Sequence, residues 1–182
     1  MKRMGMRDMT CKSILKRWIL LTLLLGLLLP SLALCEPTAE DYTKIIESNP
    51  EDVSAYFDRG CLYFEQQLYD EALSDFTKVI EMEPETAVYY HYRGNVYLML
   101  ALYDEAIADN TKTIELNPEF VYAYNDRAVA YYYLGRYEDA ITDYTAAIVL
   151  DPYDADYYLN RAAAYEAAAA ADRDTAESLQ KN

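Results

Sequence analysis

The sequence predicts an all-α protein, a short α-solenoid of antiparallel helix pairs. One residue pattern returns every 34 residues along the 182-residue chain, and a fixed period of this length is typical of helical repeat arrays. Within each period, apolar residues recur at three- and four-residue spacing over two stretches of about a dozen residues, which indicates a pair of amphipathic helices. A proline then ends the second helix, because it lacks a backbone donor and restricts the residue before it.

The recurring anchors are tyrosine and arginine in the first helix, tyrosine and alanine in the second, and the closing proline. They are Tyr56, Tyr90, Tyr124 and Tyr158; Arg59, Arg93, Arg127 and Arg161; Tyr63, Tyr97, Tyr131 and Tyr165; Tyr69, Tyr103 and Tyr137; Ala72, Ala106 and Ala140; Pro84, Pro118 and Pro152. The chain contains 20 tyrosines but only four phenylalanines, so the core must use rings whose hydroxyl groups reach water or a partner.

Residues 1–35 precede the repeats and have the layout of a secretory signal peptide. Basic residues stand ahead of an uncharged run at residues 18–34, which Pro30 interrupts. The stretch 18–29 suits the hydrophobic part of a signal, whereas a membrane-spanning helix takes about 20 apolar residues. Cleavage before Glu36 would leave the repeats outside the cytoplasm.

Two alternatives to cleavage stay open. The whole uncharged run at residues 18–34 could be retained as an N-terminal anchor helix. Alternatively, Cys35 could carry a lipid, since residues 32–35 resemble a bacterial lipoprotein box except at Leu34. In each case we expect an extracytoplasmic protein that is secreted, periplasmic or membrane-anchored.

The elements follow in order from the phase of the repeat. Residues 36–52 match only the second helix of a unit and form a half repeat. Three full units follow, at residues 53–86, 87–120 and 121–154, and the first of them should have helices at residues 53–67 and 70–82. In the last segment, 155–182, the tyrosine and alanine expected to begin a second helix are replaced by Ala171 and Asp174. This segment is predicted to be a degenerate fourth repeat ending in a polar capping helix, as terminal units require.

Arginine, aspartate and threonine recur at equal phase and predict a structural ladder of ion pairs within or between units, since the guanidinium fork matches a carboxylate. The ladder consists of Arg59, Arg93, Arg127 and Arg161 with Asp41, Asp75, Asp109 and Asp143, and with Thr43, Thr77, Thr111 and Thr145 two residues on. Small residues also recur inside the first helices, where they predict close approach of a facing helix. These are Gly60, Gly94, Ala128 and Ala162.

The charge balance argues against nucleic acid as a partner. The formal net charge is −15, and residues 1–35 hold six of the 16 Lys and Arg but one of the 31 Asp and Glu, so the remaining chain carries −20. Phosphate binding needs clustered basic residues, which the repeats lack. The acidic surface favours a basic or neutral protein partner, or serves solubility alone.

Catalysis finds little support in the sequence. His91 is the single histidine, so neither a histidine metal cluster nor a nucleophile triad with a spare ligand is easily assembled. The five glycines are isolated and make no phosphate-cradling loop. Paired acids at the start of the second helices complement the helix dipole. We therefore expect no enzyme, no metal and no cofactor.

These residues and their period resemble the tetratricopeptide repeat family, over residues 38–165 or so. The resemblance implies a right-handed superhelix whose concave face, lined by the first helices, holds a peptide or helix of a partner protein. The groove residues that it implies are Phe57, Cys61, Phe64, His91, Asn95, Met99, Tyr122, Asn125, Tyr132 and Tyr133, although several of these rings could instead pack between units. Aromatic anchors carry much of the energy of such interfaces.

Some members of that family grip the terminal carboxylate of a chaperone with basic residues. The corresponding places here hold Phe57, Cys61, Tyr92, Tyr122 and Asp126, without a basic pair. The sequence thus predicts an exported protein-interaction module with another class of partner. The alternative is a structural protein that self-associates through the ends of its array, where an unpaired helix leaves an apolar edge.

Overall fold

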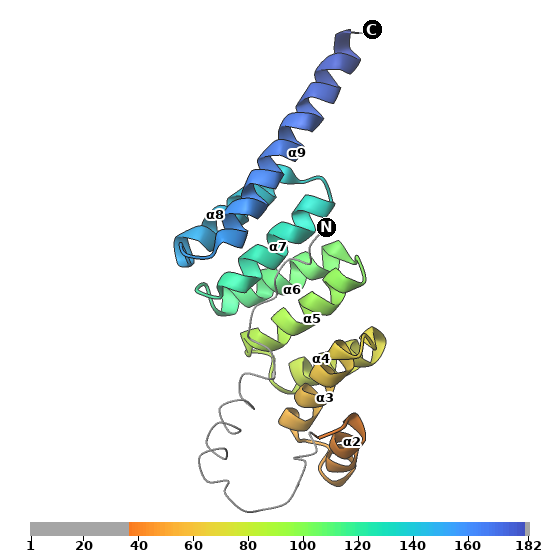
Figure 1. Ribbon diagram of the computed structural model, residues 1–182. Helices are drawn as coiled ribbons and strands as arrows, with labels where there is room; N and C mark the ends of the chain where they lie inside the picture. Colours follow the sequence, from red (N-terminus) through yellow and green to blue (C-terminus); the bar gives the residue numbers. More distant parts are fainter. Residues whose placement is uncertain (1–36, 181–182) are drawn as a thin grey trace, which may run out of the picture. The chain divides into compact units, whose positions relative to one another are not determined.

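The computed structural model describes residues 37–180, and within them every regular element is an α-helix (Figure 1). The all-α prediction is confirmed for this part of the chain. The helices are α2 (Ala39–Ser48), α3 (Val53–Glu65), α4 (Tyr69–Met82), α5 (Ala87–Met99), α6 (Tyr103–Leu116), α7 (Val121–Tyr133), α8 (Tyr137–Leu150) and α9 (Ala155–Gln180). The predicted signal or anchor at residues 1–35 lies outside the described residues.

The chain divides into two compact units after Asp75. The first contains α2, α3 and the beginning of α4, and α2 packs on α3. α2 begins with a capping box in which the backbone N–H of Asp41 donates to Thr38 and the backbone N–H of Thr38 donates to the Asp41 carboxylate. Asp52 caps α3 by accepting from the N–H of Ala55 at 3.0 Å. The starts of α2 and α3 are therefore fixed by local side chains.

The second unit contains the end of α4 and helices α5 to α9, which pack in chain order: α5 on α6, α6 on α7, α7 on α8 and α8 on α9 (Figure 1). α5 also contacts α7, so first helices of successive pairs are neighbours. Fully buried Val96, Ala106, Ala123 and Ala147 lie between the helices. Small buried residues allow this close packing of helix on helix.

The turns inside the pairs depend on a left-handed residue after the first helix, as is common at helix C-termini. Gln67, Ala101 and Gly135 occupy equivalent positions and have φ of 63°, 57° and 73°. Only the third is glycine, the residue that adopts this conformation without a steric cost. The glycine pattern alone did not reveal the first two turns.

The last segment, 155–182, was expected to be a degenerate fourth repeat with a capping helix. The structure has one continuous helix, α9, over Ala155–Gln180. At the place of the turn in earlier pairs stand Ala169 and Ala170, and alanine is the strongest helix former. Every residue from 171 to 180 is exposed. The helix that would have folded back instead continues into solvent.

Candidate protein-binding face

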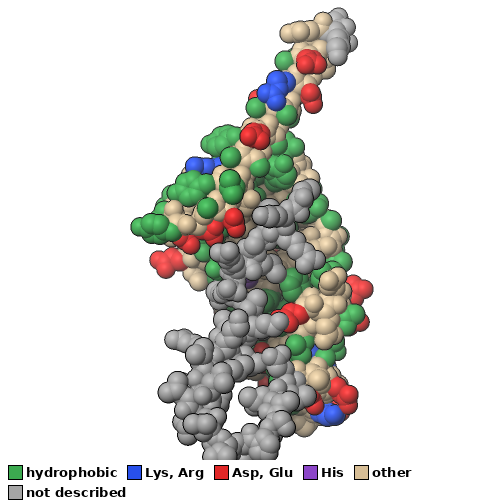
Figure 2. Space-filling view, in the orientation of Figure 1, with side chains coloured by type: hydrophobic (Ala, Val, Ile, Leu, Met, Phe, Trp, Pro, Cys, Tyr) green, Lys and Arg blue, Asp and Glu red, His purple; other side chains and the backbone are tan. Residues whose placement is uncertain are grey.

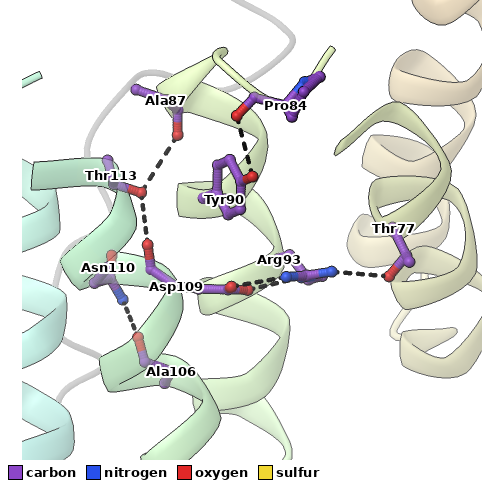
Figure 3. A network of polar contacts seen from close by, with 9 residues as sticks. All are labelled: Thr77, Pro84, Ala87, Tyr90, Arg93, Ala106, Asp109, Asn110 and Thr113. Carbon is purple, nitrogen blue, oxygen red and sulfur yellow. Dashed lines mark hydrogen bonds and ion pairs between the residues drawn. The ribbon is translucent and has the colours of Figure 1, made fainter. Parts of the chain in front are cut away.

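The predicted ladder residues meet around the arginines of the first helices. Arg93 of α5 donates from Nε and Nη2 to the two carboxylate oxygens of Asp109 on α6, both at 2.8 Å, and from Nη1 to Thr77 of α4 at 3.3 Å (Figure 3). The Arg93 and Asp109 side chains are only 17% and 8% exposed. The Arg93 guanidinium thus joins α6, the second helix of its own pair, to α4, the second helix of the preceding pair.

The same geometry recurs at two other arginines but not at the ends of the ladder. Arg59 holds Asp75 at 2.7–2.8 Å and Thr43 at 2.9 Å, and Arg127 holds its own aspartate and threonine at 2.7–3.0 Å. Arg161 donates to Thr145 at 3.1 Å, and the position that would supply its aspartate is an exposed residue of α9. At the other end, Asp41 belongs to the capping box of α2. The ladder arginines Arg59, Arg93 and Arg127 are committed to holding helices together.

The recurring tyrosines support these arginines. Tyr90 and Tyr97 place their rings 5.9 Å and 5.8 Å from the guanidinium carbon of Arg93, within reach of a cation–π contact. The hydroxyl of Tyr90 donates to the carbonyl of Pro84 at 3.1 Å, which ties the first helix to the preceding turn (Figure 3). This contact explains why tyrosine, and not phenylalanine, occupies the position.

The residues implied as a groove differ widely in exposure. Met99 and Tyr133 are 52% and 53% exposed. Phe57, Phe64, Tyr122, Asn125 and Tyr132 are partly buried. His91, Asn95 and Cys61 are buried. Phe57, Cys61 and Phe64 belong to α3 of the first unit, and the other seven belong to α5 and α7 of the second.

Met99 and Tyr133 occupy equivalent positions, 34 residues apart, at the ends of α5 and α7. Residues 91, 95 and 99 form one stripe of α5, and residues 122, 126 and 133 form one stripe of α7, because side chains three or four residues apart share a helix face. We call the surface formed by Met99, Tyr122, Asp126 and Tyr133, together with buried His91 beneath it, the first-helix face.

A line of polar side chains crosses the first-helix face from α9 to α5. The amide of Asn160 donates to Oδ1 of Asn125 at 3.3 Å, and the amide of Asn125 donates to Oδ1 of Asp126 at 3.1 Å. Oδ2 of Asp126 lies 3.5 Å from Nδ1 of His91. The amide nitrogen of Asn95 lies 3.2 Å from Nε2 of His91. Since an amide nitrogen can only donate, Nε2 accepts, and the neutral imidazole carries its proton on Nδ1, the atom that faces Asp126.

Two buried polar atoms of this region have no hydrogen-bond partner among the described residues, Nδ1 of His91 and Oδ1 of Asn110. Buried polar atoms are nearly always paired, because an unpaired one has lost its water without replacement. Asn110 is fully buried under Gly94, where an added Cβ would lie 3.0 Å from its amide nitrogen. Of the two, Nδ1 of His91 is the atom that lies beside the partly exposed Asp126 side chain.

Burial disfavours charge on both members of the His91–Asp126 contact. It lowers the pKa of His91 from its ordinary 6.5 to about 4, with the Asn110 side chain opposing the change. It raises the pKa of Asp126 from 3.8 to about 7, with the Asn125 amide opposing. Near neutral pH the imidazole is uncharged and the carboxyl group lies close to its titration midpoint.

Aromatic rings surround the histidine. The Phe120 ring centroid is 4.8 Å from that of His91, and those of Tyr92 and Tyr122 are 5.7 Å and 6.4 Å away. Tyr132 packs against the core cluster of Ala128, Ala140 and Tyr144 and meets Tyr133 edge-on, while Tyr133 stacks on Tyr103 of α6. Tyr132 is thus largely structural, and Tyr133 is the exposed ring of the pair.

Sequence reasoning did not assign Asp126, Asn110 or Asn160 to the site. The sequence feature that could have identified them is that each differs from the residues at the same repeat position in the neighbouring units. Position 126 corresponds to Tyr92 and Asn160 in the neighbouring units, and position 110 corresponds to Phe76 and Tyr144. The ladder arginines repeat from unit to unit, whereas the residues at positions 126 and 110 differ from those of the neighbouring units.

Residues 37–180 contain no group of three histidine, cysteine, aspartate or glutamate side chains that could hold a metal ion. In the same range, no helix combines the length and apolar character needed to cross a membrane.

The model of the tetratricopeptide repeat matches residues 53–85 and 121–154. Among solved structures, the first tetratricopeptide repeat domain of Spaghetti (RPAP3), bound to the HSP90 peptide SRMEEVD, is 27% identical, covers 65% of this chain and 94% of its own, and has a TM-score of 0.64. The tetratricopeptide repeat domain of Arabidopsis OM64 is 25% identical, covers 64% of this chain and 96% of its own, and has a TM-score of 0.62. MamA is 24% identical over 70% and 75%, with a TM-score of 0.68, and shows the fold alone. No curated protein sequence matches the chain.

Proposed function

Because the chain belongs to the tetratricopeptide repeat family, we propose that it is a protein-interaction module that binds a peptide or helix of a partner protein on the first-helix face. The observation that carries the proposal is the half-exposed pair Met99 and Tyr133, at equivalent positions of α5 and α7, together with buried His91 on the stripe of Met99, whose Nδ1 has no hydrogen-bond partner among the described residues. Rings and thioethers supply anchor area, and unpaired donors and acceptors fix orientation. Binding is by surface complementarity, without chemistry.

The partner differs in class from the acidic peptide bound by the RPAP3 domain. The basic side chains of α5 and α7, Arg93 and Arg127, are occupied by Asp109 and Asp143, and Arg136, which follows α7, pairs with Asp139. The face itself carries the carboxyl group of Asp126, which makes no ion pair with lysine or arginine among residues 37–180. A peptide rich in glutamate and aspartate would meet repulsion here and no compensating cation.

Capture from a host lysate tests the proposal with variants of the full-length chain. The variant Met99→Ser/Tyr133→Ser removes both exposed anchors and leaves the core residues in place. The control is Val149→Ser, which removes a 76% exposed apolar side chain from α8. We expect mass spectrometry to identify a protein retained by wild type and the control but lost from the double variant. A partner retained by all three would refute the first-helix face as the binding surface. Replacing Tyr132 is avoided, because its loss would also disturb the core.

We further propose that the module is exported. The support is the basic and then apolar pattern of residues 1–35, which precedes the repeats. Intact-mass and N-terminal analysis of the protein from cell fractions distinguishes the forms. A chain beginning at Glu36 is the expected product. A chain that keeps residues 18–34, or one beginning with a lipid-bearing Cys35, would identify a membrane-attached form, and an uncleaved chain in the cytoplasm would refute export.

Self-association is the second candidate function, and the start of α9 favours it. Tyr153, Leu159 and Tyr165 are 94%, 66% and 55% exposed. Figure 2 shows hydrophobic side chains gathered over α8 and the first half of α9. Within the described residues, no further helix covers α9 as α6 covers α5. Light scattering over a range of concentrations tests this: a mass that rises with concentration in wild type but not in Leu159→Glu would support assembly through α9, and a constant monomer mass would exclude it.

A further inference from the structure

The carboxyl group of Asp126 is the unusual member of the first-helix face, because no basic residue compensates it. Its Oδ1 accepts from the Asn125 amide at 3.1 Å, and its Oδ2 lies 3.5 Å from His91, a distance too long for a good hydrogen bond. Within residues 37–180 it makes no ion pair with lysine or arginine. The side chain is 18% exposed, so a group arriving from solvent can reach it.

The titratable groups that face Asp126 offer no positive charge either. They are His91 on α5, which burial keeps neutral, Tyr144 on α8 and Tyr157 on α9. The pKa values of both tyrosines are raised, chiefly by burial and in smaller part by the nearby Asp126 charge. An ionised carboxylate in such surroundings is disfavoured until a cation joins it.

Aromatic rings around His91, which lies beside the carboxylate, complete a set of groups that suits a cation. Tyr122 lies one helical turn before Asp126 on the same stripe of α7, and Phe120 precedes that helix. Both rings contact His91, with the Tyr122 and Phe120 centroids 6.3 Å apart. Aromatic faces attract ammonium and guanidinium groups, and more strongly away from water.

We infer that the first-helix face binds a lysine or arginine side chain of the partner segment, with the cation paired to the Asp126 carboxylate and lying against the ring of Tyr122. This inference rests on the proposed function and specifies the partner's chemistry. The unpaired Nδ1–H of His91 donates to Oδ2 once the bound cation has drawn the carboxylate into its charged form. The acidic surface of the chain attracts the same class of partner over a longer range.

Because of proton linkage, the inference also predicts how the affinity for a cation depends on pH. Since the free carboxyl group has a pKa of about 7, a cation that binds the ionised form displaces a proton below that pH. Affinity for a cation should therefore rise as the pH increases toward 7 and level off above it. A neutral ligand of the same shape should show no such dependence from this group.

Carbon-13 NMR of aspartate carboxyl groups in the full-length chain tests the inference. The probes are Nα-acetyl-lysine N-methylamide and Nα-acetyl-norleucine N-methylamide, whose side chains share the four-carbon stem and differ by the terminal ammonium group. We expect the lysine derivative to move the Asp126 and His91 resonances, to lower the pKa of Asp126, and to bind about tenfold more tightly than the norleucine derivative at pH 8.

Two variants complete the design. Asp126→Asn keeps the shape of the side chain and should abolish the preference for lysine, as seen in the resonances of His91. Glu105→Gln removes the same charge from the exposed surface of α6 and should preserve the preference. Equal binding of the two derivatives, or unchanged Asp126 and His91 resonances throughout the lysine titration, would overturn the inference. The capture experiment with Met99→Ser/Tyr133→Ser tests the proposed function separately. If wild type retains a partner that the double variant loses, and that partner's binding segment has no lysine or arginine, the proposed function is supported although this inference is wrong.

Discussion

Each of the arginines Arg59, Arg93 and Arg127 acts on three helices at once. Arg93 makes two parallel hydrogen bonds to Asp109 and a third to Thr77, while two tyrosine rings flank its guanidinium. Bidentate, charge-assisted bonds are the strongest that side chains make. Because the aspartate is almost completely buried, loss of the arginine would leave a carboxylate without its counter-ion in the interior.

The change Arg93→Ala is therefore expected to lower the free energy of unfolding by about 2–4 kcal/mol, somewhat less than the loss of a fully buried pair because Arg93 keeps partial exposure. Urea denaturation measures it. Arg136→Ala is the matched control, since Arg136 pairs with Asp139 at 2.7 Å with both side chains about half exposed. An effect of Arg93→Ala no larger than that of Arg136→Ala would contradict the buried-pair interpretation.

His91 and Asp126 affect stability in opposite directions as the pH changes. Burial raises the pKa of Asp126 from 3.8 to about 7, so the stability contributed by this group is present below pH 3.8 and is lost as the pH rises through 7. Burial lowers the pKa of His91 from 6.5 to about 4, so its contribution is present above pH 6.5 and is lost as the pH falls through 4. The two effects largely cancel in the wild-type protein between pH 4 and 6.5.

Single substitutions should separate the two effects. Relative to wild type, Asp126→Asn should gain unfolding temperature as the pH rises from 4.5 to 6.5, because only the His91 contribution remains. His91→Gln should lose unfolding temperature over the same interval. Differences from wild type at each pH remove the contribution of the other carboxylates. Slopes of the same sign in both variants would contradict the assignment of the two buried groups.

At the scale of elements, the burial of a residue in a helix depends on whether another helix packs against it. Ala128 of α7 is fully buried and lies in a core cluster with Ala140 and Tyr144 of α8. Ala162 has the same phase in α9 but is exposed, because α9 continues as one helix and does not fold back. The same residue in the same repeat position therefore has two different environments.

One substitution at both positions measures that difference. Ala128→Leu adds three carbon atoms to a closely packed contact and should cost about 1–3 kcal/mol of unfolding free energy. Ala162→Leu adds them to an exposed surface and should change it by less than about 0.5 kcal/mol. Thermal or urea unfolding of the pair gives the comparison. A cost at Ala162 equal to that at Ala128 would mean that a further helix, or a second copy of the chain, covers α9.

At the scale of the whole molecule, the chain combines a strong acidic excess with buried ion pairs. The formal net charge is −15, and the exposed surface bears most of the aspartate and glutamate. Repulsion among exposed charges destabilises a compact state and is screened by salt, whereas the buried Arg–Asp pairs are screened much less.

The unfolding temperature at pH 7.5 should therefore rise when the sodium chloride concentration increases from about 10 mM to about 150 mM, because the Debye length falls to about 8 Å. Differential scanning calorimetry measures the change, and sodium sulfate at equal ionic strength serves as a control for specific chloride binding. A fall in unfolding temperature would indicate that exposed ion pairs, such as that of Lys44 and Glu40, outweigh the general repulsion.

The sequence by itself determined the helices, their pairing and the 34-residue repeat, since these follow from local periodicity. Tyrosine, arginine and proline return in phase because they make the same packing contacts in each unit. It did not determine which first-helix residues lie open to a partner. Met99 is exposed while His91 and Asn95 on the same stripe are buried, and the difference depends on rings from α7 and the preceding turn. The alignment of Asn160, Asn125 and Asp126 across two helices, and the pKa values that burial imposes on Asp126 and His91, also arise only from tertiary packing. Repetition can be read along the chain, but which side chains stay exposed and which polar atoms stay unpaired depends on neighbours that are distant in sequence.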